Sequence, residues 1–126
     1  MSVVLDSSAL LAWAWDEPGA GRIDDAIGGG LVSAVNWAEV LTRLVERGLS
    51  DQEARDALEE FPIRVVPFDA AQAVAAGLLR RATRAAGLSL GDRACLALAQ
   101  AERLPALTAD RAWGELDLDV AVEVVR

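Results

Sequence analysis

Several residue types are missing from this sequence, and each absence excludes a kind of chemistry. The 126 residues contain no His, no Lys and no Tyr. Without His, the Ser-His-Asp and Cys-His nucleophile systems and His-ligated zinc are excluded. Without Lys, a catalytic Schiff base and the phosphate-binding lysine of a Walker A loop are excluded. Any catalysis must therefore depend on Asp and Glu, or on a metal ion that they hold.

Cysteine is scarce as well, and no stretch stays apolar for long. The lone Cys95 excludes an internal disulfide and a cysteine cluster for metal. No apolar run approaches the ~18 residues of a membrane span. The N-terminus has no basic segment before an apolar core, so we expect no signal peptide. These features together favour a protein of the reducing cytoplasm.

The composition is that of a folded protein with an excess of acid. Hydrophobic residues make up 53%, and the length predicts one domain over residues 1–126. The net charge is −8, and all twelve positive charges are Arg, which suits phosphate contacts. Because acid dominates, any nucleic-acid contact must be local, through an arginine rim or a bound cation. A basic protein partner is an equally natural interpretation.

Short apolar runs alternate with helical patterns along the chain. The expected strands cover residues 2–5, 31–34, 63–67, 105–108 and 120–125. The expected helices cover residues 9–15, 22–27, 35–47, 51–60, 70–86 and 90–103, with a single turn near Trp113. This alternation predicts a three-layer α/β/α domain with a five-stranded, mostly parallel sheet.

The helical segments predict which faces are buried. The first helix, capped by Ser7 or Ser8, is apolar all round, so it is either deeply buried or faces another subunit. Two later helices have an apolar stripe that we expect to face the core. The stripes consist of Val35, Ala38, Leu41 and Val45 in one helix, and of Val74, Leu78, Ala82 and Ala85 in the other.

Four acids fall where the chain enters or begins a helix. Asp6 ends the first strand, and Asp110 follows the fourth. Glu39 lies about one turn into the helix after the second strand, and Asp92 lies in the first turn of its helix. In a parallel sheet, the carboxyl ends of the strands and the starts of the following helices share one edge, which is where ligands bind.

Each acid also has a purely structural interpretation. Asp6 and Asp110 can cap helices, Glu39 can pair with Arg43, and Asp92 can complete a capping box with Ser89. Capping does not require all four to share one edge, however. Four neighbouring carboxylates repel one another unless they share a cation, and Mg²⁺ or Mn²⁺ prefers such oxygen ligands. A metal-bound water is a nucleophile near neutral pH, so phosphodiester hydrolysis needs none of the missing residues.

Four segments together resemble a known family. They are residues 4–10 (VLDSSAL), 33–40 (SAVNWAEV), 88–99 (LSLGDRACLALA) and 107–110 (LTAD). In this order and spacing the chain resembles PIN-domain ribonucleases, and more closely the VapC-type toxins of bacterial toxin–antitoxin pairs. The resemblance covers nearly the whole chain. It implies a five-stranded parallel sheet, a Mg²⁺- or Mn²⁺-dependent endoribonuclease acting on RNA, and a cognate antitoxin.

The resemblance also implies roles for particular residues. The metal ligands and catalytic acids would be Asp6 and Asp92, completed directly or through water by Glu39 and Asp110. The hydroxyls of Ser7 and Thr108 would hold a carboxylate or a metal water. Asn36 either orients Glu39 by a hydrogen bond or is a solvated helix residue.

Arginines and tryptophans supply further candidates. Arg93 and Arg111 each neighbour a proposed ligand and are candidates for RNA phosphate contacts. The cluster of Arg80, Arg81 and Arg84 is either a second phosphate contact or the solvated face of its helix. The three tryptophans Trp13, Trp15 and Trp37 form either core or a partner groove. The resemblance implies a homodimer, and an antitoxin helix bound in an apolar groove.

Two other functions compete with the ribonuclease. A non-catalytic binding module on the same fold would act through protein–protein contacts and keep the acids as caps. An aspartate phosphotransfer domain also places Asp at the end of the first strand, but it normally needs a Lys near the last strands, and the sequence has none.

Overall fold

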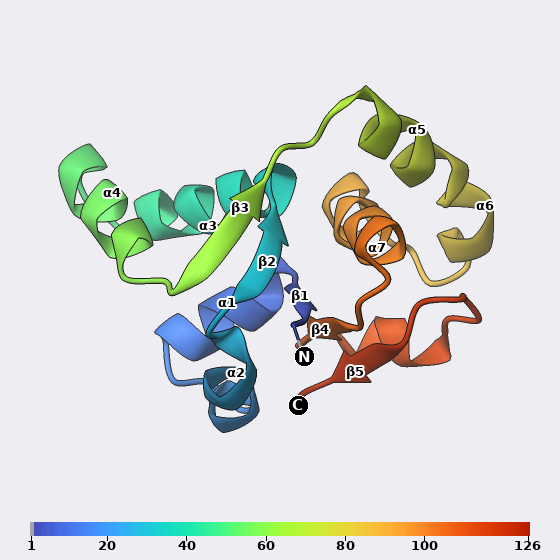
Figure 1. Ribbon diagram of the computed structural model, residues 1–126. Helices are drawn as coiled ribbons and strands as arrows, with labels where there is room; N and C mark the ends of the chain where they lie inside the picture. Colours follow the sequence, from blue (N-terminus) through green and yellow to red (C-terminus); the bar gives the residue numbers. More distant parts are fainter. Residues whose placement is uncertain (1) are drawn as a thin grey trace.

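The computed structural model describes residues 2–126, and its five strands form one sheet (Figure 1). The strands are β1 (Val4–Leu5), β2 (Gly30–Ser33), β3 (Ile63–Val66), β4 (Ala106–Thr108) and β5 (Val122–Val124). Their order is β3-β2-β1-β4-β5, and every pairing is parallel. The predicted three-layer fold with a parallel five-stranded sheet is confirmed.

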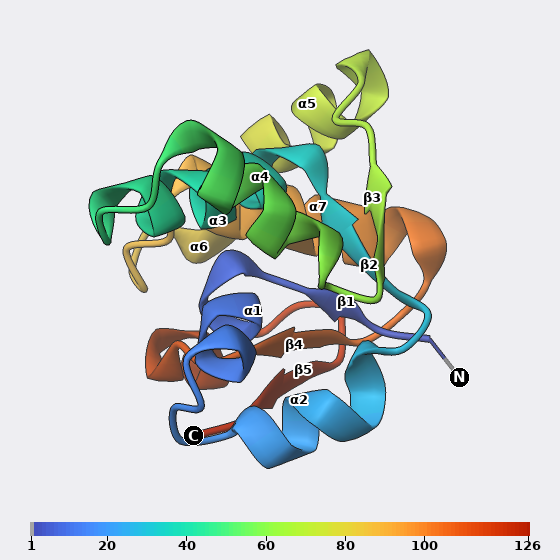
Figure 2. The same ribbon diagram turned by 90° about the vertical axis from the view of Figure 1, so that its left-hand side faces the viewer.

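Helices cover both faces of this sheet, as the two views show (Figures 1 and 2). One group is α1 (Ser7–Ala14), α2 (Ala20–Ile27), α3 (Ala34–Glu46) and α4 (Asp51–Glu59). The other is α5 (Ala70–Leu78), α6 (Arg80–Thr83), α7 (Leu90–Glu102) and the 3-10 helix η1 (Arg111–Glu115). No helix among residues 2–126 combines the length and the apolar content that a membrane crossing requires.

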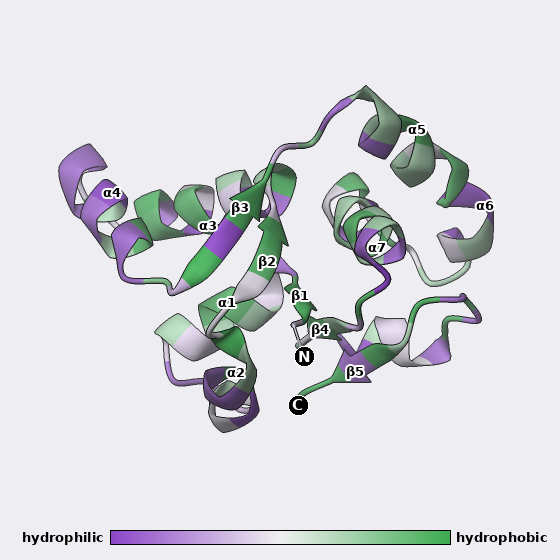
Figure 3. Cartoon of the chain, in the orientation of Figure 1, coloured by the Kyte–Doolittle hydropathy of each residue, from purple (hydrophilic) through white to green (hydrophobic). Residues whose placement is uncertain are grey.

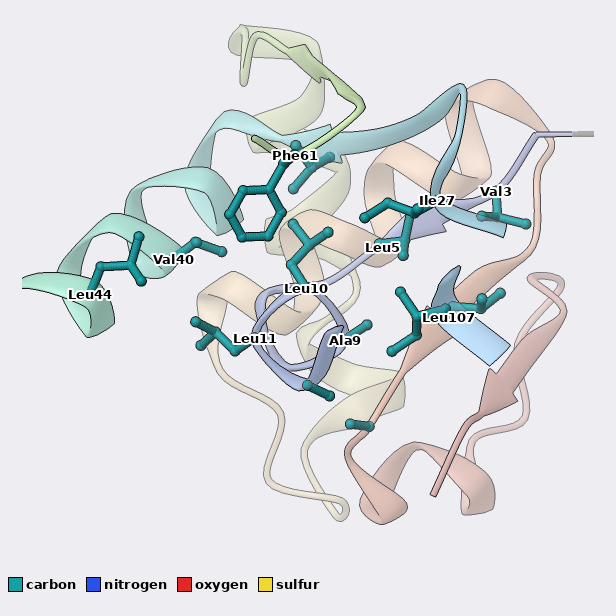
Figure 4. Close-up of a cluster of buried hydrophobic side chains, with 14 of the residues drawn as sticks. Val3, Leu5, Ala9, Leu10, Leu11, Ile27, Val40, Leu44, Phe61 and Leu107 are labelled. Carbon is teal, nitrogen blue, oxygen red and sulfur yellow. The ribbon is translucent and has the colours of Figure 1, made fainter. Parts of the chain in front are cut away.

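Two apolar clusters hold the layers together, one on each face of the sheet. Val4 and Leu5 are neighbours in β1 but belong to opposite clusters, because successive strand residues point to opposite faces. Figure 4 shows Leu5 among side chains from α1, α2 and α3. Full burial of one such Leu stabilises the fold by about 1.5–3 kcal/mol. Hydrophilic residues gather instead on outer helices such as α4 (Figure 3).

The first helix differs from the prediction in its cap. Asp6, rather than Ser7 or Ser8, is the N-cap, so α1 begins two residues earlier than expected. Of the two alternatives for this apolar helix, deep burial holds, since its central residues 9–12 are all buried.

The predicted stripe of α3 is wrong in part: Leu41 packs against the core, but the fully buried residues are different ones. Its buried residues are Asn36, Val40 and Leu44, whereas Ala38 and Val45 are exposed. The buried residues, which are four apart, form one stripe that is rotated from the predicted one, because α3 packs between α1, α4, α7 and the sheet.

The helix predicted over residues 70–86 is also different, because it is divided into α5 and α6. Gly77, a poor helix former, lies two residues before the break at Leu79. The predicted core stripe of this segment is wrong too. Val74 and Leu78 are 63% and 76% exposed, whereas Ala76 and Leu79 face α7 in the core. The long helix therefore packs through a different side from the one expected.

The strand order determines where a site can form. From β1 the chain moves outward to β2 and β3, and it then returns across the sheet to β4 on the other side of β1. The direction of winding therefore reverses between β1 and β4. In open parallel sheets, ligands bind beyond the carboxyl ends of the strands at such a point.

Candidate functional site

Asp6 lies at the carboxyl end of β1 and is almost completely buried, with 2% of its surface exposed. Its Oδ1 accepts a hydrogen bond from the Ala9 N–H at 2.8 Å. The hydroxyls of Ser8 and Thr108 donate to the same carboxyl, Thr108 at 2.6 Å. Burial raises the pKa of Asp6 to about 6, the charge of Asp92 adds to this effect, and the hydrogen bonds oppose it. A nearby cation would stabilise the ionised form of such an acid.

Two hydroxyl groups join the ends of β1 and β4 around Asp6. Ser8 Oγ donates to the carboxyl and accepts from the Ala109 N–H at 3.0 Å. Thr108 Oγ1 donates to the carboxyl and accepts from the Asp110 N–H at 3.0 Å. Thr108 was predicted to support the site, but Ser8 was considered only as a helix cap. Ser8 follows the strand-ending acid by two residues, but nothing in the sequence shows its contact with Ala109.

Glu39 is fixed by two side chains from different helices. Its Oε1 accepts from Ser7 Oγ at 3.1 Å and from Asn36 Nδ2 at 2.9 Å. Asn36 is 1% exposed, so of its two predicted roles, orienting Glu39 is correct and solvation is wrong. The alternative pairing of Glu39 with Arg43 is not formed, because Arg43 Nε lies 3.4 Å from Glu46 instead.

Gly91 has no side chain, and the Glu39 carboxyl occupies the space that a side chain would fill. Asn36 Nδ2 also donates to the Gly91 carbonyl at 2.9 Å, which connects α3 to α7. A Cβ on Gly91 would stand only 2.6 Å from Glu39 Oε1, closer than real contacts allow. The missing side chain of Gly91 therefore leaves the space that the Glu39 carboxyl occupies, and a Cβ there would displace that carboxyl. No sequence signal identified Gly91, because the contact joins residues 52 positions apart.

Asp92 and Asp110 have the structural roles that the sequence offered for them. Asp92 forms a capping box with Ser89, accepting from the Ser89 N–H at 2.9 Å. Asp110 caps η1 by accepting from the Ala112 N–H at 2.9 Å. Asp92 is half-buried and Asp110 is exposed. These caps bring both acids to the edge of the sheet that holds Asp6.

Three of the four acids lie near one buried thiol, that of Cys95. Burial raises the pKa of the Cys95 thiol, and the charges of Asp6, Asp92 and Glu39 raise it further. Three of the four predicted acids therefore act on one buried sulfur atom under the site. Asp110 is not among them and lies on the exposed rim, next to the hydroxyl that holds Asp6.

The donor set fits a hard divalent cation, but the carboxylates do not enclose one as they are oriented. Among residues 2–126, no three acidic side chains are grouped closely enough to hold a metal ion. Glu39, Asp92 and Asp110 are each hydrogen-bonded to protein donors instead. All these groups offer oxygen, which Mg²⁺ and Mn²⁺ prefer. The buried Oδ1 of Asn36 also has no hydrogen-bond partner in the described chain.

The two predicted phosphate contacts lie in different surroundings. Arg93 Nη1 donates to the Ala76 carbonyl of α5 at 3.0 Å, so this guanidinium is engaged with a helix rather than with the acids. Arg111 is exposed and lines an open pocket together with Ser8 and Asp110. The arginines at positions 80, 81 and 84 are exposed on or next to α6.

The tryptophans border a groove as well as the core. Trp13 and Trp37 contact the Phe61 ring, with centroids 5.2 and 5.5 Å apart, and both are half-buried. Trp13, Trp15 and Phe61 line a groove between α1 and α4, whose rim carries acidic residues. The rim acids are Glu53, Asp56 and Glu60.

Several solved structures with the same fold come from toxin–antitoxin complexes, and one is described as a toxin. A toxin–antitoxin complex from Klebsiella pneumoniae matches with a TM-score of 0.78 and 20% identity, covering 99% of this chain and 98% of that one. VapBC2 from Rickettsia felis, bound to a promoter DNA fragment, matches with a TM-score of 0.71 and 18% identity over 100% of both chains. VapC20 from Mycobacterium tuberculosis, a toxin that cleaves the sarcin-ricin loop, matches with a TM-score of 0.71 and 18% identity, covering 95% and 99%.

The sequence itself provides the family assignment. No curated protein matches the chain. The family model of the PIN domain, however, matches residues 3–118, which is nearly the whole length. The resemblance noted in the sequence is thereby confirmed, and the chain belongs to the PIN domain family.

Proposed function

We propose that this protein is a Mg²⁺- or Mn²⁺-dependent endoribonuclease and the toxin of a type II toxin–antitoxin system. The observation that carries the proposal is the buried Asp6, which lies between β1 and β4 with the charges of Glu39 and Asp92 nearby. The structural similarity to VapC-type proteins supports it, as does membership of the PIN domain family.

In this proposal the four acids bind the metal ion together. Asp6, Glu39, Asp92 and Asp110 hold the ion, directly or through water. When bound, Mg²⁺ or Mn²⁺ supplies a water nucleophile near neutral pH and offsets charge that develops on the phosphate. Hydrogen bonds from Ser8 and Thr108 fix the Asp6 carboxyl.

Other side chains position the remaining acid and the substrate. Ser7 and Asn36 hold Glu39 in place through its Oε1. Arg111, which is exposed beside Asp110, contacts an RNA phosphate. Arg93 would have to leave the Ala76 carbonyl before it could contact one, so Arg111 is the better candidate.

Cleavage of RNA tests this proposal. We expect the purified protein to cut single-stranded RNA with Mn²⁺ or Mg²⁺ present and to be inactive with EDTA. Asp6→Asn should lose cleavage while keeping the circular dichroism spectrum of the fold. Wild-type rates in EDTA or in the Asp6→Asn variant would contradict the assignment.

The second candidate function is a non-catalytic binding module that acts through protein–protein contacts. The capping roles of Asp92 and Asp110 favour it, because these acids already have a structural purpose. Metal titration separates the two functions. A shared acid site binds the ion and raises the melting temperature, whereas isolated caps respond only to ionic strength.

The proposed protein partner is a cognate antitoxin. The groove bordered by Trp13, Trp15 and Phe61 has an apolar floor and an acidic rim. An amphipathic segment with aromatic or aliphatic anchors and basic flanks complements both features. The same basic segment could place an arginine against the acids. Within this proposal the protein acts in the cytoplasm, where its RNA substrate and the antitoxin are found.

A homodimer is also part of the proposal, but its surface is not the one that the sequence suggested. The central residues of α1 are buried within the chain, so the apolar surface they carry is not available to a second subunit. Val74 and Leu78 on α5 instead expose an apolar face that a second copy of the chain would cover. The molar mass in solution, measured by light scattering, tests this part.

A further inference from the structure

Two open pockets flank the acidic site, and Ser8 lines both of them. The first lies beyond β4 and is bordered by Ala109, Asp110 and Arg111. The second lies between α1 and α3, where Leu11, Val35, Glu39 and Arg43 line it. Asp6 lines neither pocket, but its buried carboxyl accepts from the hydroxyl of Ser8, the residue that the two pockets share.

Each pocket contains an arginine that is free to contact a ligand. Among the described residues, the ion pairs do not include Arg111. Arg43 forms an ion pair with Glu46, at 3.4 Å, and both side chains are more than half exposed. Its guanidinium carbon also lies over the Trp15 ring, 5.7 Å from the centroid, which is farther than that of Arg47. Exposed pairs of this kind contribute little to stability, so Arg43 can leave Glu46 at small cost.

The charge of the chain makes these two arginines important for any polyanion. With a net charge of −8, the protein as a whole repels nucleic acid, so attraction must come from cations close to the site. Arg43 and Arg111 meet this condition on opposite sides of Ser8. The walls that Leu11 and Val35 give the second pocket also suit the apolar face of an unstacked base.

We propose that single-stranded RNA crosses the acidic site from one pocket to the other. Arg111 contacts a phosphate on one side of the bond to be cut, and Arg43 contacts one on the other side. This inference rests on the proposed ribonuclease function and adds to it a substrate path with two separate phosphate contacts. Double-stranded RNA cannot follow this path, because its paired bases are unavailable to the pocket between α1 and α3.

The path can be tested by binding in a protein that does not cut. In the Asp6→Asn background, the affinity for a short labelled single-stranded RNA is measured by fluorescence anisotropy over a series of KCl concentrations. Arg43→Ala and Arg111→Ala should each weaken binding several-fold. Each should also reduce the slope of log K against log salt by about 0.7, the value for one phosphate contact with a single strand. In the double variant the two reductions of the slope should add, because the two contacts are to different phosphates.

Two other arginines provide matched controls. Arg47 lies at the same end of α3 and stacks on Trp15 with its guanidinium carbon 3.7 Å from the ring centroid, yet it lines neither pocket. Arg84 lies just after α6. Arg47→Ala and Arg84→Ala should leave the salt slope unchanged. Equal losses in these controls, unchanged slopes in Arg43→Ala and Arg111→Ala, or equally tight binding of duplex RNA would overturn the path.

Cleavage by the wild-type protein separates this inference from the function on which it rests. If the wild type cuts RNA with Mn²⁺ while the arginine variants bind normally, the path is wrong and the ribonuclease function stands. If the wild type neither cuts nor binds RNA, both are wrong.

Discussion

Asp6 and Asp69 occupy the same position in two helices, yet only Asp6 belongs to the candidate site. Each follows a strand and is the N-cap of the next helix. Each carboxyl accepts from the backbone N–H three residues later, Ala9 at 2.8 Å and Gln72 at 2.9 Å. Asp6 is nevertheless 2% exposed, whereas Asp69 is at the surface. The local motif is therefore the same, and its surroundings differ.

The difference arises from the strand that each acid follows. β1 lies at the centre of the sheet with β4 beside it, so hydroxyls from both strand ends reach Asp6. β3 is an edge strand that pairs only with β2. Position in the sheet, rather than the capping motif, makes an aspartate part of a site. Variants of the two acids can test this conclusion.

The largest expected effect is on RNA cleavage. Asp6→Asn should lower the rate by at least about 100-fold, the size of effect seen when a group that stabilises transition-state charge is removed. Asp69→Asn keeps the same capping oxygen on the surface and should cut at the wild-type rate. Both rates are measured with Mn²⁺ in excess. Equal losses in the two variants would mean that the position in the sheet is irrelevant.

The next effect concerns the stability of the metal-free protein. The folded state binds the Asp6 proton more tightly than the unfolded chain, because its pKa is about 6 rather than 3.8. The free energy of unfolding therefore decreases as the pH rises between these values and stays lower above about pH 6. The difference corresponds to about 3 kcal/mol.

Asp6→Asn removes this charge and should be more stable than the wild type at pH 7.5 in EDTA, by up to about 3 kcal/mol. At pH 4 the advantage should nearly vanish, since the wild-type carboxyl is then protonated in the folded state. Urea unfolding of both proteins at the two pH values measures this difference in the free energy of unfolding. A difference that does not depend on pH would contradict the buried, ionisable Asp6.

A smaller effect on cleavage is expected from a change that fills space beside an acid without altering its charge. Gly91→Ala places a Cβ against the Glu39 carboxyl and should displace it from Asn36. We expect about a tenfold loss of cleavage, as for other residues that orient a metal ligand. Gly77→Ala, where a Cβ meets no atom within 4 Å, is the control and should cut normally. A Gly91→Ala protein with full activity would show that cleavage does not depend on the position of the Glu39 carboxyl.

The smallest effect is that of the surface cap. Asp69→Ala removes the acceptor for the Gln72 N–H and should destabilise the protein by about 1 kcal/mol. This loss should be independent of metal and should leave cleavage unchanged. Thermal unfolding with and without Mn²⁺ measures it. A loss of stability that depends on metal would mean that Asp69 belongs to the site, which would contradict the difference drawn between Asp6 and Asp69.

The sequence predicted the strands, most helices and most capping residues, because these depend on local patterns. The predicted capping box of Ser89 and Asp92 forms as its pattern requires. Burial of helix faces was predicted less well. Asn36 lies on the polar side of its helix by periodicity, yet it is buried because α7 packs there.

The same limit explains which parts of the site were missed. The four acids could be proposed from their position and residue type, and Thr108 and Asn36 from the family resemblance. Gly91 could not, because its importance is the space that it leaves for a side chain of another helix. The role of Ser8 depends on Ala109 and Thr108, about a hundred residues away, and no local pattern shows that contact.

Calorimetric titration with Mn²⁺ tests the central claim most directly, because it asks whether the acids around Asp6 act together. The wild type and Asp69→Asn should bind the ion with the same affinity, and Asp6→Asn should lose that binding. If the wild type shows no heat beyond a matched change in ionic strength, or if Asp6→Asn binds Mn²⁺ as the wild type does, these acids are not a metal site.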